Sequence, residues 1–156
     1  MTRLQLAQRR AFQIAPGNAV ILNGAAGPFI AMKALREGKE YFHHYLVDLD
    51  PPRDGTAGMI YVDPEELLAD CGRRPEIELG TADDAGPPGV GDVFCNAKGT
   101  FLKLHEDPKS QKMYAFVKVD GGTLLRRQER GITAVHRRWR LKGLAGGLTV
   151  AEALAG

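Results

Sequence analysis

The sequence lacks any apolar run of about 18 residues, so we expect no segment of it to span a membrane. It has only two cysteines, Cys71 and Cys95, which lie far apart and outside any CxxC pattern. Such cysteines fit reduced, packed thiols better than a disulfide framework or a zinc site. The opening residues are basic, but Gln and Arg interrupt their apolar positions, unlike a secretion signal. We therefore expect a protein that is cytoplasmic during synthesis.

Catalytic and metal-binding signatures are also missing. The chain contains no GxSxG, HExxH or P-loop pattern. His43 and His44 would point to opposite sides of a strand and so cannot share a metal ion. His105 and His136 have no cysteine or acid at a suitable ligand spacing. We expect a non-enzymatic protein with no cofactor and no metal site.

What is present is an ordinary globular composition. The chain has 156 residues, of which 44% are hydrophobic and 26% are charged, enough for one sizeable core. Residues 81–91, TADDAGPPGVG, read as a Gly/Pro linker. We expect a single compact unit, residues 1–156, with two candidate lobes: an acidic, mixed lobe (1–80) and a basic, β-rich lobe (90–143).

Period-two alternation dominates the second half. Residues 112–119, KMYAFVKV, alternate apolar and polar faces, and two strand-like segments flank a turn at Lys98-Gly99. Two short helices are expected: one over 63–72, where Asp63 and Pro64 read as a helix start, and one after Thr149, which has capping-box spacing with Glu152. The predicted class is α+β, mainly β, with antiparallel hairpins forming a small sandwich or barrel.

Residues 28–37 have two interpretations. They read as a helix beginning at Pro28, or as a strand paired with residues 40–49 across a hairpin loop. In the helical interpretation, VILNGAAGPFIAMKALREG resembles part of a dinucleotide-binding βαβ unit, although only GxxG of its glycine fingerprint is present. A nucleotide-binding α/β enzyme is therefore an alternative that requires this helix.

Charge is distributed unevenly along the chain. Residues 1–97 hold 9 Lys/Arg against 14 Asp/Glu, a balance of −5, and residues 98–156 hold 12 against 5, a balance of +7. Such asymmetry predicts either self-complementary assembly or an anionic partner for the second half, unless the two halves neutralise each other within one fold. We expect a homo-oligomer, with residues 40–97 supplying the acidic surface.

The basic charge is concentrated in residues 124–143, LLRRQERGITAVHRRWRLKG, which hold seven Arg and Lys side chains and one Glu. If residues 132–142 form one strand, Trp139 points to the core with Val135 and Leu141, while the basic residues at 138, 140 and 142 face outward. Arginine suits carboxylates and phosphates alike. The candidate partner-binding residues are Arg126, Arg127, Arg130, Arg137, Arg138, Arg140 and Lys142.

The segment GDVFCNAKGTFLKLHEDPKSQKMYAFVKVDGG, with the arginine strip after it, resembles in general style the capsid decoration (cement) proteins of tailed bacteriophages. That resemblance implies a structural virion protein that binds at joints between capsid subunits, often as a trimer, and stabilises the assembly through protein–protein interaction. The main alternative is a nucleic-acid-binding module using residues 126–142. A sequence pI of about 8.6 is low for a dedicated nucleic-acid binder, which favours carboxylates over phosphates as the target.

Overall fold

The structure, a computed structural model, describes residues 6–36, 44–49, 58–83, 86–104, 115–126 and 130–155. The strands are β1 (Ala7–Arg10), β2 (Ala19–Gly24), β3 (Gly27–Arg36), β4 (His44–Asp48), β5 (Met59–Val62), β6 (Leu67–Asp70), β7 (Pro75–Leu79), β8 (Val93–Asn96), β9 (Gly99–Lys103), β10 (Phe116–Lys118), β11 (Thr123–Leu125), β12 (Ala134–His136), β13 (Trp139–Leu144) and β14 (Leu148–Thr149). A 3-10 turn, η1 (Ala11–Gln13), and a helix, α1 (Val150–Ala155), complete the described elements.

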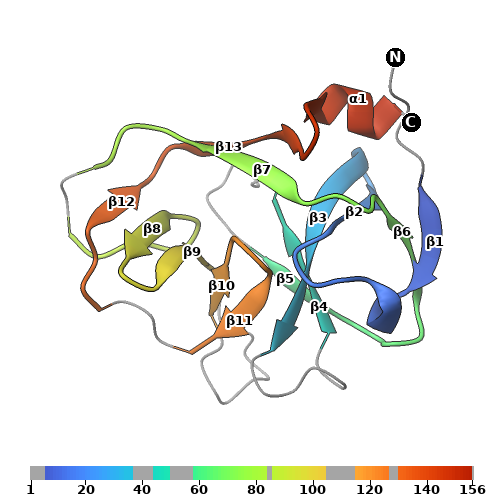
Figure 1. The fold of residues 1–156 in the computed structure, drawn as a ribbon, viewed down its shortest axis with the longest axis horizontal. Helices are drawn as coiled ribbons and strands as arrows, with labels where there is room; N and C mark the ends of the chain where they lie inside the picture. Colours follow the sequence, from blue (N-terminus) through green and yellow to red (C-terminus); the bar gives the residue numbers. More distant parts are fainter. Residues whose placement is uncertain are drawn as a thin grey trace.

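Two sheets make up the fold. The larger sheet has the order β1-β6-β2-β3-β11-β10-β9-β8-β12, with β4 and β5 joined to it through β3. Its pairs are antiparallel, except that β11 runs parallel to β3. The smaller sheet has the order β14-β13-β7, and its strands β7 and β13 run side by side along one side of the molecule (Figure 1). We call these two strands the β7–β13 ribbon.

The ribbon packs against the largest hydrophobic core. Ile77, Trp139 and Leu141 from the ribbon contact a buried cluster on the larger sheet. That cluster draws on both predicted lobes and contains Met32, Ala34, Tyr45, Val47, Leu49, Val93, Leu102, Leu104, Val117 and Leu124. The chain on both sides of the 81–91 segment therefore builds one core, and β7 from before the segment pairs with β13 from after it.

The predicted fold class is confirmed: the structure is mostly β, with antiparallel hairpins and one short α-helix, and its sheets do not close into a barrel. Residues 27–36 form strand β3 and not a helix, because β3 is paired with β2 on one edge and β4 on the other. The predicted β8–β9 hairpin is present, but its turn is at Ala97-Lys98 and not at Lys98-Gly99, because Gly99 belongs to β9 and pairs with Asn96. The terminal helix begins as expected, with the Glu152 backbone N–H donating to Thr149 Oγ1 over 3.1 Å.

The helix predicted over 63–72 is wrong. Asp63 does accept a hydrogen bond at Oδ1 from the Glu65 backbone N–H, 2.8 Å away, but it caps a turn. The chain then continues as β6, which pairs with β1 on one side and β2 on the other. Start signals at Asp63 and Pro64 are local, and sheet pairing of residues 67–70 overrides them.

Lys33 fastens the N-terminal turn onto the larger sheet. Its side chain is fully buried, and Nζ donates hydrogen bonds to the carbonyl oxygens of Ala11, at 2.6 Å, and Ile14, at 3.3 Å. Burial lowers the pKa of Lys33 to about 8, an effect opposed by the nearby Asp70 carboxylate. The carbonyls of the turn therefore solvate a cation that water does not reach.

Glycine is required where β11 joins β3. Gly122 has a φ of +69°, and a Cβ atom there would lie 2.4 Å from the carbonyl oxygen of Lys33 and 2.5 Å from the amide nitrogen of Gly17. The Leu35 N–H donates to the Gly122 carbonyl over 2.9 Å at the same junction. The parallel pairing of β3 and β11 therefore depends on a backbone contact that a side chain would block.

Helices contribute little to this fold. Within the described ranges, no helix has the length and apolar character needed to cross a membrane.

Candidate functional site

The arginine strip does not form one surface. It runs from the end of β11 through β12 to β13, and these strands lie at separate places on the molecule (Figure 1). Arg126 and Arg130 are exposed in the connection between β11 and β12, and Arg130 accepts a hydrogen bond at its carbonyl from Asn96 Nδ2. Arg127 lies outside the described residues. Only the stretch from Arg137 onward belongs to the ribbon and its approach.

The expectation of a single strand over 132–142 is wrong, because the chain changes partner at Arg137. β12 pairs with β8 in the larger sheet, whereas β13 pairs with β7 in the smaller one. The 81–91 segment holds this break in place: Asp83 Oδ2 accepts a hydrogen bond from the Arg137 backbone N–H over 2.9 Å, and the Gly80 N–H donates to the Arg138 carbonyl over 2.7 Å.

Within β13 the predicted alternation is present. Trp139 and Leu141 are half-buried and pack on the core, while Arg140 and Lys142 are exposed, as is Arg138 just before the strand. Trp139 Nε1 donates to the Gly91 carbonyl oxygen at 2.7 Å. The indole nitrogen is therefore held on the core side, as the sequence indicated, while part of the half-buried ring lines an open depression beside Arg138 and Arg140.

Two arginines of the strip pair with acids of the same chain. Arg137 Nη1 forms an ion pair with Asp92 Oδ2. Across the ribbon, Arg140 Nη2 lies 2.9 Å from Glu78 Oε2, and these two residues are register partners. Both acids belong to residues 40–97, which we expected to supply an acidic surface to a neighbouring copy. The two charged halves thus neutralise each other in part within one fold.

The outer face of the ribbon keeps an excess of positive charge. Arg138 and Lys142 are exposed on either side of Arg140, and neither forms an ion pair with any residue that the structure describes. An open depression of about 430 Å³ lies here, lined by Glu78, Gly80, Arg138, Trp139 and Arg140. Arg138, Arg140, Lys142 and Glu78 therefore make up the candidate site, which we call the outer ribbon face.

Gly80 lines the depression on the outer ribbon face. A Cβ atom at Gly80 would lie 2.5 Å from the Arg138 carbonyl oxygen, so close pairing of the two strands excludes any side chain there. Sequence analysis missed Gly80 and Glu78 as parts of this site. The alternation of Glu76 and Glu78 around Ile77 was the available signal, since acids at every second position of a strand share one face.

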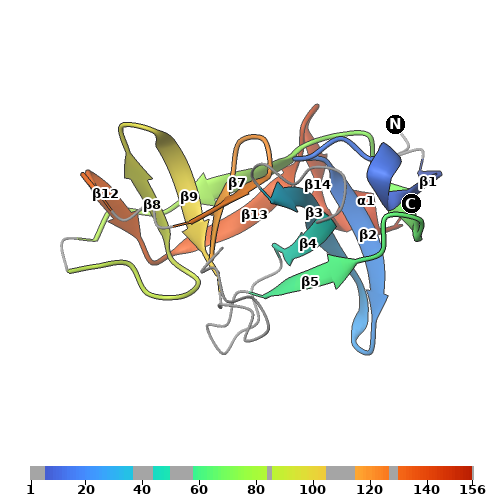
Figure 2. The same cartoon turned by 90° about the horizontal axis from the view of Figure 1, so that it is seen from below.

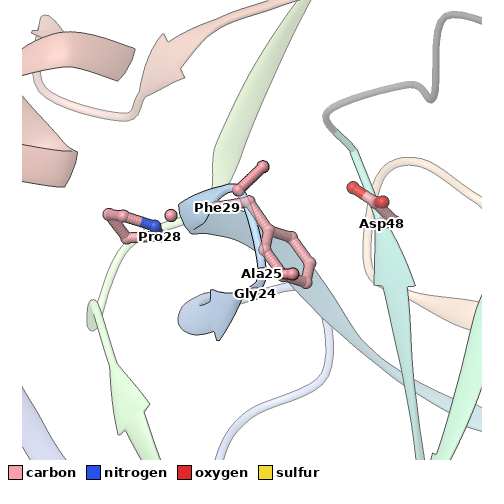
Figure 3. A pocket seen from close by; sticks show the side chains of 7 residues that line it. Gly24, Ala25, Pro28, Phe29 and Asp48 are labelled. Carbon is pink, nitrogen blue, oxygen red and sulfur yellow. The ribbon is translucent and has the colours of Figure 1, made fainter.

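A second depression, of about 280 Å³, lies at the tip of the β2–β3 hairpin (Figure 3). Phe29 packs against Gly24, where a Cβ atom would be 3.0 Å from its ring, and Asp48 on β4 lines the same space. This is the GAAG segment that the nucleotide-binding alternative needed between a strand and a helix. Because the segment is a turn between two strands, the βαβ unit on which that alternative rested is not formed.

Neither cysteine points to redox or metal chemistry. Cys71 is buried and Cys95 is half-buried, and both are free thiols, as expected. Burial, with a smaller contribution from the Asp70 carboxylate, raises the pKa of Cys71 to about 11, which keeps it protonated and unreactive at neutral pH. The described ranges contain no group of three His, Cys, Asp or Glu side chains arranged to hold a metal ion.

Comparison of the chain with protein-family models, with curated proteins and with solved structures found no match.

Proposed function

We propose that this protein is a non-enzymatic interaction protein that binds an acidic protein surface through the outer ribbon face. The observation that carries this proposal is the exposed row of Arg138, Arg140 and Lys142 on a ribbon whose other face is packed on the core. Strand β13 fixes the backbone of Arg140 and Lys142, so binding has to order the side chains of the cations but not the backbone of these two residues.

The position of the indole favours carboxylates over nucleic acid as the target. Proteins that bind single strands stack bases on exposed aromatic rings. Trp139 is the only tryptophan in the chain, and its half-buried ring packs on the core and is tied to Gly91 through Nε1, so only part of it lines the depression. A ring that is fixed and only partly exposed is a poor stacking platform, whereas arginine and lysine suit the carboxylates of a protein surface.

The charged row is too small to give high affinity by itself. Exposed ion pairs contribute about 0.2–1 kcal/mol each, so one copy would bind weakly. Many copies on a repetitive surface would bind strongly, because each further contact adds to the same attachment. This argument, with the sequence resemblance, supports the finer proposal of a structural protein that decorates a virion capsid, acting as an oligomer.

Binding of poly-L-glutamate, compared with random single-stranded DNA and RNA at matched ionic strength, tests the target class. We expect saturable binding of poly-L-glutamate that weakens as salt rises, with weaker binding of both nucleic acids. Tighter binding of DNA or RNA would overturn the proposal and support a nucleic-acid-binding module. Light scattering after size exclusion tests the oligomer, and a monomer at both low and high salt would contradict that part.

A further inference from the structure

We propose that the outer ribbon face binds an extended acidic segment whose two carboxylates are four residues apart, with a non-acidic residue midway between them. This inference rests on the proposed function and adds the pattern that a partner must carry. The pattern follows from the fact that Arg140, the middle one of the three cations, already has the Glu78 carboxylate beside it.

The spacing comes from the geometry of the strand. Residues on one face of a strand recur every second position, and each residue advances the chain by about 3.3 Å. Arg138 directly precedes β13, and Lys142 lies at the irregularity between Leu141 and Gly143 where the register with β7 shifts. The four residues from Arg138 to Lys142 therefore span at most about 13 Å. An extended segment lying along the row would place carboxylates at its own positions i and i+4 opposite these two cations.

The residue of the bound segment that faces Arg140, midway between its two carboxylates, should not be acidic. Arg140 lies between Arg138 and Lys142, and the Glu78 carboxylate is 2.9 Å from its guanidinium. A third carboxylate above this pair would meet the negative charge of Glu78, and like charges held close together repel. A neutral residue avoids that repulsion, and the hollow above Gly80 leaves space for its side chain.

A short segment suits this face better than a second copy of the protein. Stable protein interfaces bury about 800 Å² on each partner, which far exceeds what one row of five residues on a strand provides. The face also carries mixed charge, because Glu78 lies beside the arginines. A segment of about five residues with two acids matches the length of the row and the two cations that form no ion pair with a described residue.

Two capped heptapeptides of equal composition and charge test the pattern: TETTTET, with acids four residues apart, and TTETETT, with acids two apart. Trp139, the only tryptophan, lines the depression and serves as a fluorescent reporter for titrations at low ionic strength. We expect TETTTET to bind about twofold to fivefold more tightly, which corresponds to one further exposed ion pair.

The Glu78→Gln variant provides the matching control. Removing the Glu78 charge makes Arg140 available, and Arg138 and Arg140 are then two residues apart, as the acids of TTETETT are. We expect this variant to lose the preference for TETTTET. Equal binding of both peptides by the unaltered protein would overturn the spacing and leave the proposed function standing. Binding of neither peptide, nor of poly-L-glutamate, would overturn both.

Discussion

Arg137 forms an ion pair with Asp92 across 45 residues of sequence, and this pair joins the residue before β8 to the break between β12 and β13. Asp92 Oδ2 also accepts a hydrogen bond from the Gly89 backbone N–H over 2.7 Å. Arg137 was a candidate for contact with a partner, but the structure gives it a role in holding its own chain together. Arg137 is therefore not part of the outer ribbon face.

Loss of this ion pair should reduce stability without a change in binding. We expect Asp92→Ala to lower the free energy of unfolding by about 1–2 kcal/mol, because the Arg137 guanidinium and the Gly89 N–H both lose an acceptor. Arg137→Gln should cost about 1 kcal/mol, and Arg138→Gln, at an exposed position, less than about 0.5 kcal/mol. Urea denaturation of Asp92→Ala, of Arg137→Gln and of the variant that carries both changes measures the coupling energy between Asp92 and Arg137. A coupling energy near zero would show that the ion pair contributes nothing to stability.

Gly122→Ala should be strongly destabilising. Its Cβ would lie 2.4 Å from the Lys33 carbonyl oxygen, so the parallel contact of β3 and β11 would have to open, at a cost of about 3 kcal/mol or more. Gly131→Ala is the matched control, since Gly131 has a similar φ of +62° but nothing within 4 Å of the added atom. That variant should lose only about 1–2 kcal/mol. Similar losses for both in thermal or urea unfolding would show that the close approach is unimportant.

Lys33 should make stability depend on pH in the alkaline range. Its pKa is about 8 in the folded protein, below its ordinary value of 10.5. Between these values the unfolded chain binds more protons than the folded protein, so the free energy of unfolding rises with pH. Relative to Lys33→Met, the unaltered protein should gain about 2 kcal/mol between pH 7.5 and pH 10.

The comparison with Lys33→Met is needed because Cys71 changes the free energy of unfolding with pH in the opposite direction to Lys33. Its raised pKa means that the folded protein holds a proton that the unfolded chain has lost, so its contribution falls as pH rises from about 9 to about 11. Both proteins contain Cys71, so its contribution cancels in the difference. Parallel pH profiles for the two proteins would contradict the account of Lys33.

The sequence was sufficient for the fold class and for many elements, because alternation and turn residues act locally. The β8–β9 hairpin and the capped terminal helix were both predicted from such signals. The helix over 63–72 failed because β6 is held between two strands that come from residues 7–10 and 19–24. A turn cap at Asp63 cannot reveal a pairing that depends on distant residues.

The candidate site was predicted only in part. Alternation correctly assigned Trp139 to the core side and Arg140 to the outer side of β13. The ion pairs of Arg137 and Arg140 could not be predicted, because each depends on strand pairing between distant residues. Asp92 reaches Arg137 through the pairing of β8 with β12, and Glu78 reaches Arg140 through the pairing of β7 with β13. Net charge along the sequence therefore overstated the cations that remain for a partner.

The most direct test of the central claim compares two double variants in the poly-L-glutamate assay. Arg138→Gln with Lys142→Gln removes two positive charges from the outer ribbon face, and Arg10→Gln with Lys98→Gln removes two from exposed sites on β1 and the β8–β9 turn, away from the ribbon (Figures 1 and 2). We expect the first pair to weaken binding about tenfold and the second less than about twofold. Equal losses would show that binding follows net charge alone and would contradict a site on the ribbon.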